Sequence, residues 1–352
     1  MKRVLLLVCL LPLLTSCSFV TLERQIYPIC MSIDTDEDGN CRIGIQAPRA
    51  SGGLNASYEI LTATGETFDT ALRTLSASTP YPLNFSQIRL CLLGYSTAAK
   101  TELRPLLRRV FELPTMRPTC YVSIAMGSAL EVMQYQQPDF GMRLSTHLSL
   151  MLDRMQEEEL LPESTLSACV RELGDGRSDL LIGLCAVDAR LIPEEKKTEK
   201  AHPSGDASPA AAMGEPWSDA LLPEDMVSGL LPHTSQNPVE YLGAAAVSGG
   251  RVSGVLTADQ VQLCLRLKEE ARLLTAREGE RVQLQIHLPK EGPLAQSADA
   301  VMGLMETLQA LHSDAMGFGR ICSMGFWTDA AWERFDFRSR YPSASLWVGI
   351  DE

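Results

Sequence analysis

Cys17 is the residue of this sequence whose type and setting point most clearly to chemistry. It follows the small side chains of Thr15 and Ser16, which in turn follow the aliphatic Leu14. A signal peptidase needs small side chains beside the bond that it cuts. A cysteine that becomes the new N-terminus also offers a free thiol to carry diacylglycerol. The spacing therefore predicts lipidation at Cys17.

The segment ahead of Cys17 has the composition of a secretory signal peptide. Lys2 and Arg3 form a basic start, and residues 4–14 form an apolar core that is too short to cross a bilayer as a stable helix. Residues 14–17 resemble the bacterial lipobox. We therefore expect cleavage before Cys17 and a palmitate-type lipid anchor on the outer face of a membrane, where several acyl chains on one residue hold stably. An ordinary secretory signal with an incidental cysteine is the alternative.

The other cysteines form no metal or redox pattern. Cys9 leaves with the signal peptide, and the later cysteines include no CxxC pair and no histidine at ligand spacing. Cys91 lies inside the apolar run 88–93, and Cys120 precedes a β-prone run, so both are interpreted as small core residues. A stray disulfide is the alternative. The cysteines concerned are Cys30, Cys41, Cys91, Cys120, Cys169, Cys185, Cys264 and Cys322.

An acidic segment at residues 34–40 permits two interpretations. Its Asp, Gly and Asn residues match the first six positions of a calcium-binding loop, but position twelve is Ile45 rather than the bidentate Glu that such a loop needs. An Asp/Gly/Asn cluster between two β-prone runs is typical of a hairpin. We therefore predict a hairpin and no metal site.

Catalytic signatures are missing from the sequence. It contains no HExxH, GxSxG, Walker loop or SxxK motif. The histidines are scattered, and a Ser/His/Asp triad assembled from distant residues is the one arrangement that a sequence alone does not exclude. We expect no catalytic, cofactor-binding or metal-ligating residue, and thus a protein that is not an enzyme. The histidines are His147, His202, His233, His287 and His312.

Composition and charge exclude further classes. An apolar content of 45% is enough for folded cores. The net charge of -13 becomes -15 once Lys2 and Arg3 are removed, because 29 basic residues then face 44 acidic ones. Such an acidic chain is not expected to bind nucleic acid or to grip anionic lipid electrostatically. No later stretch reaches about 18 consecutive apolar residues, so we expect no second membrane span.

Periodicity predicts an α+β fold, with mixed sheets flanked by helices in two or three domains. The first block alternates strand and helix after its hairpin, and a second hairpin opens the later block. Thr257 is expected to cap the helix that follows it. The expected strands are 28–33, 41–46, 58–63, 87–93, 120–125, 180–187, 241–247, 251–256, 282–288 and 344–350, and the expected helices are 68–75, 101–113, 128–136, 144–158, 166–173, 260–267 and 298–315.

The composition changes sharply in the middle of the chain. Residues 191–238 are rich in Pro, Ala and Ser and show little periodicity, which is typical of a linker. We therefore predict a signal peptide at 1–16, one or more N-terminal αβ domains at 17–190, the linker at 191–238 and a C-terminal αβ domain at 239–352.

Three segments resemble the C-subunit lipoproteins of spore germinant receptors, the GerC or Ger(x)C family. The first is the acidic turn 32–39, followed at a distance by Gln46. The second is 63–94, with a glycine-opened helix and an aromatic-Ser-polar entry into a strand. The third is 314–319, a D-x-x-G-F-G motif with a tryptophan-bearing tail after it. The chain departs from the family in its linker and in residues 18–24, which lack the usual Trp-Asp-like start.

The resemblance implies a function. Family members are lipobox proteins that act on the outer face of the spore's inner membrane. They work with a permease-like multi-span subunit and a second membrane subunit in the response to nutrients. The chain is therefore expected to be a non-catalytic receptor subunit needed for nutrient-triggered germination.

The residues of these motifs also have plain structural interpretations. The glycines of the motifs are expected where a turn needs positive φ or where packing is close. Asp314 is expected to cap a turn, and Trp327 and Trp332 are expected to be core anchors rather than ligand platforms. The glycines concerned are Gly65, Gly94, Gly317 and Gly319.

Two other functions remain open from the sequence. A solute-binding lipoprotein of a membrane transporter is the main alternative, although such proteins usually have two doubly wound domains rather than blocks that open with hairpins. A secreted hydrolase is the third, for which no nucleophile stands out.

Overall fold

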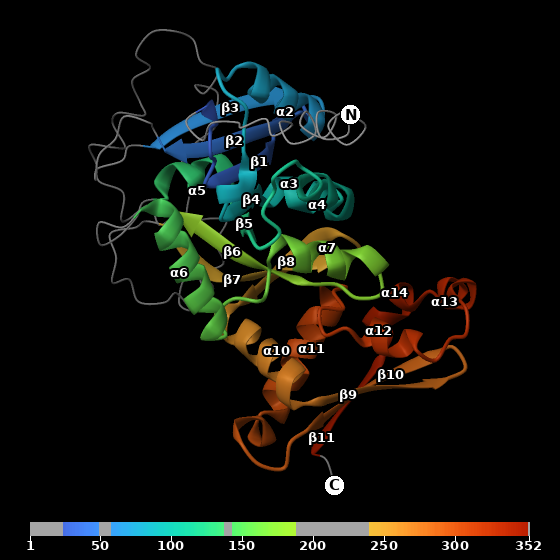
Figure 1. Cartoon of the computed structure of the whole chain (residues 1–352). Helices are drawn as coiled ribbons and strands as arrows, with labels where there is room; N and C mark the ends of the chain where they lie inside the picture. Colours follow the sequence, from blue (N-terminus) through green and yellow to red (C-terminus); the bar gives the residue numbers. More distant parts are fainter. Residues whose placement is uncertain (1–23, 49–57, 137–142, 188–238, 351–352) are drawn as a thin grey trace, which may run out of the picture.

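The computed structural model describes residues 24–48, 58–136, 143–187 and 239–350 and arranges them around two sheets (Figure 1). The signal peptide, Cys17 and the 191–238 linker lie outside the described residues. Sheets flanked by helices confirm the predicted α+β class.

The first sheet has eight strands in the order β3-β2-β1-β4-β5-β6-β7-β8. The neighbours β1, β4, β5 and β6 run parallel, whereas β2 and β3 at one end and β7 and β8 at the other pair antiparallel. The bounds are β1 Cys30–Thr35, β2 Cys41–Pro48, β3 Tyr58–Gly65, β4 Leu90–Gly94, β5 Tyr121–Ala125, β6 Leu181–Val187, β7 Val239–Ser248 and β8 Arg251–Thr257.

The acidic turn joins β1 to β2 as a hairpin, as predicted. Cys30 pairs with Gln46 at one end and Thr35 with Cys41 at the other. Asp36 closes the turn, because its Oδ1 accepts the backbone N–H of Asn40 at 2.8 Å. No cluster of His, Cys, Asp or Glu suited to a metal ion occurs among the described residues.

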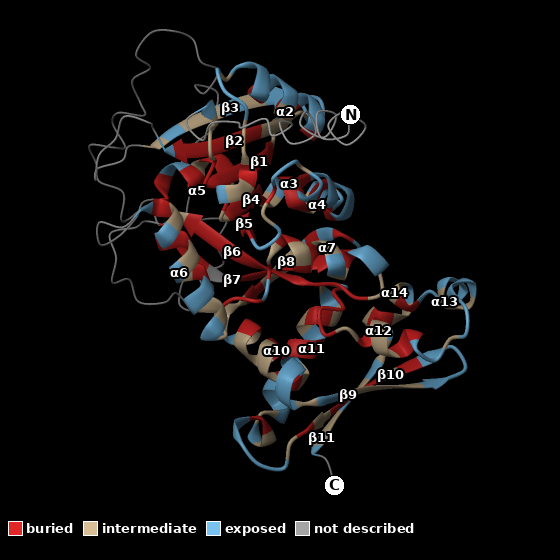
Figure 2. Cartoon of the chain, viewed as in Figure 1, coloured by how far each residue is buried: buried red, intermediate tan, exposed pale blue. Residues whose placement is uncertain are grey.

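Helices cover both faces of this sheet because its central strands are apolar on both sides. In β4, for example, Cys91 and Leu93 face one core and Leu90 and Leu92 face the other. The first core lies under α2 (Phe68–Ala77), α3 (Tyr95–Lys100), α4 (Leu103–Phe111) and α7 (Leu166–Asp175), and the second lies under α5 (Ala129–Tyr135) and α6 (Leu144–Glu157). Figure 2 shows buried strands between helices with exposed outer faces.

The second sheet has three strands in the order β11-β10-β9, with bounds β9 Arg272–Glu278, β10 Arg281–Leu288 and β11 Ser345–Ile350. Alternate residues of β10 are buried from Val282 to Leu288. They share a third core with α10 (Ala258–Glu270) and α11 (Ala298–Ala310). As predicted, Thr257 begins α10, since its hydroxyl accepts the N–H of Gln260.

The third core also contains residues of the first sheet. Leu181 of β6 and Ala244 and Ala246 of β7 belong to it, so α10 and α11 lie between the two sheets (Figure 1). The strands that follow residue 238 thus extend a sheet begun before residue 188. We propose that the C-terminal unit begins after β8, near residue 257, rather than at residue 239.

The C-terminal segment between α11 and β11 differs from the sequence-based expectation. The helix expected over 298–315 ends at Ala310, and His312 has φ +54°. Short helices follow, namely α12 (Phe318–Ser323), α13 (Asp329–Phe335) and α14 (Phe337–Arg340). Neither α3 nor β9 was expected, because α3 is only six residues long and β9 is bordered by charged residues rather than turn signals.

The eight cysteines in the described residues are free thiols, and Cys91 and Cys120 lie in the first core, so their interpretation as core residues is confirmed over the stray disulfide. Seven are buried, and Cys41 is half-buried. Burial raises the pKa of the Cys264 thiol, and burial with nearby carboxylates raises the pKa of Cys41 to about 11. These thiols are therefore protonated and chemically quiet at neutral pH.

Candidate functional site

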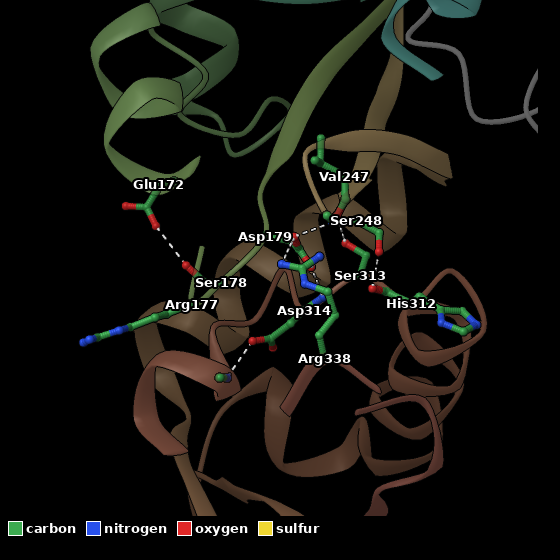
Figure 3. A network of polar contacts seen from close by, with 12 residues as sticks. Glu172, Arg177, Ser178, Asp179, Val247, Ser248, His312, Ser313, Asp314 and Arg338 are labelled. Atoms are coloured by element: carbon green, nitrogen blue, oxygen red, sulfur yellow. Dashed lines mark hydrogen bonds and ion pairs between the residues drawn. The ribbon is translucent and has the colours of Figure 1, made fainter. Parts of the chain in front are cut away.

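A network of polar contacts ties the first sheet to the C-terminal segment (Figure 3). It draws on the loop 176–180 ahead of β6, the turn 248–250 between β7 and β8, the loop 311–317 after α11, and α14. These segments lie far apart in the sequence, and the order of the strands brings them together. We call this network, centred on Asp179 and Asp314, the junction.

Asp179 is the centre of the junction. Its side chain is almost fully buried, and its Oδ1 accepts the N–H of Gly249 at 3.1 Å while its Oδ2 accepts the N–H of Asp314 at 3.0 Å. Arg338 of α14 donates to both oxygens, with the shorter bond at 3.0 Å. One carboxylate thus connects a turn of the first sheet, the loop after α11 and α14.

Asp314 is the second buried carboxylate of the junction. Its two oxygens accept the N–H groups of Phe318 at 2.8 Å and Gly319 at 2.6 Å, at the start of α12. Burial raises the pKa of this carboxyl to about 7, and the nearby Asp179 adds to the rise, while the two N–H groups oppose it. Asp314 therefore caps a turn, as predicted, with a proton that comes off near neutral pH.

Hydroxyl groups and ion pairs extend the junction. Ser313 donates to the carbonyl of Val247 at 2.6 Å, and Ser248 donates to the carbonyl of His312 at 2.6 Å. On the other side, Arg320 contacts Glu172 at 2.9 Å. Burial alone would raise the pKa of Glu172, but hydrogen bonds and ion pairs with Arg320 and Arg171 bring it below its usual value.

A cavity of about 210 Å³ opens beside Asp179 and Asp314. Trp332, Phe337 and Tyr341 supply aromatic lining, with the rings of Trp332 and Phe337 stacked at 5.7 Å. Tyr341 is 1% exposed, and its hydroxyl has no hydrogen-bond partner within the described part of the chain. Burial raises the pKa of this phenol, and the charges of Asp314 and Asp179 raise it further.

The polar side chains of the junction join segments of the chain. Its arginines hold carboxylates, and its hydroxyl groups donate to backbone carbonyls. What it offers is a rigid connection between segments, together with a small polar cavity beside it.

The glycines of the recognised motifs lie where close packing or positive φ requires them, as predicted. Gly317 has φ +84°. A Cβ at Gly319 would lie 2.3 Å from the carbonyl oxygen of Arg177, and a Cβ at Gly65 or Gly94 would have a neighbour at 2.5 or 2.3 Å.

The prediction for the two tryptophans was wrong in one case. Trp332 packs against the third core, as expected, whereas Trp327 is fully exposed in the loop between α12 and α13. The neighbouring Phe326 packs inward instead, with its ring centroid 5.5 Å from that of Trp332.

The sequence did not reveal Asp179, Arg338 or Tyr341 as site residues. Asp179 and Arg338 are 159 positions apart, so no local pattern links them. The available signal was the position of Asp179, two residues ahead of the wholly apolar β6. A carboxylate so close to a buried strand is often buried with it.

Comparison with known proteins finds a family match for the N-terminal part of the chain. Residues 19–187 match the family described as "Spore germination protein N-terminal domain". Residues 19–187 are therefore similar to this family of N-terminal domains. The resemblance to the C-subunit family of spore germinant receptors, inferred from 32–39 and 63–94, is thereby confirmed, whereas the motif at 314–319 lies beyond the matched residues.

A solved structure described as "Crystal Structure of the GerBC protein" is also similar to this chain. The likeness covers 91% of this chain and 95% of that one, at 12% sequence identity and a TM-score of 0.45. No curated protein matches the chain.

Proposed function

We propose that this chain is a non-catalytic, lipid-anchored subunit of a spore germinant receptor, needed for nutrient-triggered germination. The observation that carries the proposal is the spore germination domain at residues 19–187. That domain makes up most of the first sheet and its covering helices. The match does not favour the solute-binding lipoprotein of a transporter.

The proposed anchor is lipid on Cys17, with residues 1–16 removed as a signal peptide. Among the described residues, no helix is long and apolar enough to cross a membrane. Lipid would confine the protein to the membrane plane and raise its effective concentration near integral partners. We propose a permease-like multi-span subunit and a second membrane subunit as those partners, on the outer face of the spore's inner membrane.

Replacing Cys17 in the spore-forming host tests both the anchor and the role. We expect the Cys17→Ala chain to take up no radioactive palmitate, to leave the membrane fraction, and to lower germination with nutrients that this receptor serves. Germination would be followed by the loss of spore refractility. The matched control is Cys9→Ala, because Cys9 lies in the segment expected to be removed.

Two results would contradict the proposal. If the unaltered chain takes up no palmitate and fractionates as freely soluble protein, the anchor is wrong. If deletion of the whole gene leaves germination unchanged with every nutrient tried, in a host without a related copy, the role in germination is wrong.

A further inference from the structure

We propose that the edge of the first sheet at which β1, β4 and β5 begin rests on the membrane, where Arg89 and Arg117 bind the phosphate groups of anionic lipid. The inference rests on the proposed lipid anchor at Cys17. It is further supported by the setting of the two arginines, the point at which the chain enters the fold, the length of the tether and an exposed tyrosine.

Arg89 and Arg117 lie close together at this edge. The strands β1, β4 and β5 are parallel neighbours, so they begin on the same side of the sheet (Figure 1). Arg89 directly precedes β4, where its N–H donates to the carbonyl of Ile29 at 2.7 Å and its carbonyl accepts the N–H of Tyr121 at 2.8 Å. Arg117 lies in the turn ahead of β5, because its carbonyl accepts the N–H of Cys120 at 3.1 Å.

The two guanidinium groups lack a counter-charge of their own. Within the described part of the chain neither forms an ion pair with a carboxylate, and Arg117 donates only to the hydroxyl of Thr119, at 2.8 Å. Burial lowers the pKa of Arg89, and the nearby charge of Arg117 lowers it further, against the opposing effect of Asp153. That carboxylate already accepts the hydroxyl of Tyr121 at 2.8 Å. A phosphate group would offer oxygens to both arginines and offset their repulsion.

The chain enters the fold at this same edge. Ile26 donates its N–H to the carbonyl of Pro82 at 3.0 Å and accepts the N–H of Asn84 at 2.8 Å. Both partners belong to the loop that leads into Arg89 and β4. The first described residues therefore lie at the edge that carries the two arginines.

The tether between the proposed anchor and this edge is short. Cys17 and Arg24 are seven residues apart. A fully extended chain spans about 3.5 Å per residue, so the tether reaches at most about 25 Å. Lipid on Cys17 would therefore hold this edge within that distance of the headgroups. Arg24 itself is exposed and brings a third positive charge to the membrane end of the molecule.

The net charge of the whole chain does not decide a contact held this close. The value of -13 is distributed over the entire protein, whereas salt screens an exposed charge beyond about 8–10 Å at physiological ionic strength. The charges nearest the lipid therefore dominate. An arginine next to an anionic bilayer favours the contact by about 1 kcal/mol, which corresponds to about fivefold in the equilibrium constant.

An exposed aromatic side chain at this edge favours lipid over a free anion. Tyr81 is 45% exposed and directly precedes Pro82, whose carbonyl binds Ile26. Tyrosine prefers the boundary between water and hydrocarbon, because its ring is apolar and its hydroxyl is polar. A bilayer can take up both the ring and the arginines, whereas a free phosphate ion would gain nothing from the ring.

The test is a proximity measurement on the full-length lipidated chain in vesicles of phosphatidylcholine with phosphatidylglycerol. A fluorophore is attached through Gln87→Cys, at this edge, or through Glu37→Cys, in the turn at the far end of β1, and both positions are exposed. Cys41→Ser accompanies both changes, because Cys41 is only half-buried while the other described thiols are buried. A lipid with a nitroxide on its headgroup quenches nearby fluorophores. We expect the probe at position 87 to be quenched several-fold more strongly than the probe at position 37.

Matched variants assign the contact to the two arginines. Arg89→Gln combined with Arg117→Gln removes both charges and should lower the quenching at position 87 by at least about half. Arg89→Lys combined with Arg117→Lys keeps the charges and should preserve most of it. The control is Arg272→Gln combined with Arg281→Gln, which removes the same charge from exposed arginines of the second sheet and should leave the quenching unchanged.

Three results would overturn the inference. Equal quenching at positions 87 and 37, in a chain that floats with the vesicles, would show that this edge does not face the lipid and is free for a protein partner. Unchanged quenching in the double glutamine variant would remove the arginines from the contact. If sodium phosphate abolishes quenching that sodium chloride of equal ionic strength leaves in place, the arginines bind free phosphate rather than lipid.

Flotation separates these results from a failure of the proposed function. An unaltered chain that does not float with the vesicles would contradict the anchor at Cys17, and with it both the proposed function and this inference. A chain that floats but fails the quenching test leaves the anchor intact and overturns the inference alone.

Discussion

At the scale of the residue, buried carboxylates are the distinctive feature of this protein. The side chain of Asp34, which lies in β1, reaches the start of α5, where its oxygens accept the N–H groups of Ala129 and Leu130 and the hydroxyl of Ser128. Asp314 does the same for α12. An acidic side chain at a helix N-terminus satisfies N–H groups that the helix itself leaves unpaired.

Asp34→Asn should destabilise the protein. In the unaltered protein both carboxylate oxygens accept hydrogen bonds. Asparagine replaces one of these oxygens with an NH₂ group, which cannot accept, so at least one buried N–H loses its acceptor. We expect the free energy of unfolding to fall by about 1–3 kcal/mol, as measured by urea denaturation. Glu37→Gln, in the exposed part of the same turn, should change it by less than about 0.5 kcal/mol. Equal effects of the two changes would contradict the capping role of Asp34.

Asp314 should make stability depend on pH. Its pKa is about 7 when folded, against 3.8 ordinarily, so the folded state holds a proton that the unfolded state has lost between these values. Stability should therefore fall as pH rises from about 4 to about 7, by at most about 4 kcal/mol, and then level off.

The measurement is the free energy of unfolding against pH, for the unaltered chain and for Asp314→Asn. The variant cannot titrate at this position. Its free energy of unfolding relative to that of the unaltered chain should therefore rise as pH rises from about 4 to about 7. Parallel curves would show that Asp314 does not titrate there.

At the scale of the element, close backbone packing holds α12 against the loop ahead of β6. Gly319 lies in the first turn of this helix, beside the carbonyl oxygen of Arg177. Its lack of a side chain is what lets the helix N-terminus reach Asp314 and its neighbours.

Gly319→Ala should push α12 away from the junction. The new Cβ would lie 2.3 Å from backbone rather than from a flexible side chain, so relief requires a backbone shift. We expect a loss of about 1–3 kcal/mol and faster amide exchange at Phe318 and residue 319. Gly325→Ala is the matched control, since its nearest neighbour would lie at an ordinary 3.4 Å. A similar loss in both variants would point to a general effect of alanine rather than to packing at the junction.

At the scale of the whole molecule, the junction fixes the C-terminal segment against the first sheet. Arg338 is the cation that compensates Asp179, and the carboxylate is far more buried than the guanidinium. Removing the cation leaves a buried charge unpaired, which costs much more than losing a surface pair.

Arg338→Met should therefore weaken the junction. We expect about 2–4 kcal/mol of lost stability, with increased hydrogen exchange in α14 and in residues 312–319. The control is Arg154→Met, whose partner Glu158 is on the surface, and which should cost less than about 1 kcal/mol. Unchanged exchange at the junction in Arg338→Met would mean that packing alone holds the segment.

Local patterns in the sequence determined much of this protein. Strand alternation, the Thr257 cap and the Asp/Gly/Asn hairpin predicted most elements, because each depends on residues a few positions apart. The signal-like segment and three short motifs predicted the resemblance to the family. The expected end of the 298–315 helix was wrong, because apolar spacing continued past the point where His312 takes a left-handed conformation.

Only the tertiary structure decided how distant parts meet. The sequence did not show that β7 and β8 would complete the first sheet, that Trp327 would be exposed while Phe326 turned inward, or that Asp179 would meet Arg338 and Asp314. These outcomes depend on strand order and on which side chains fill a shared core. Neither produces a periodic pattern in the local sequence. For the same reason the cavity at the junction, with Tyr341 in its lining, forms only when three separate segments come together.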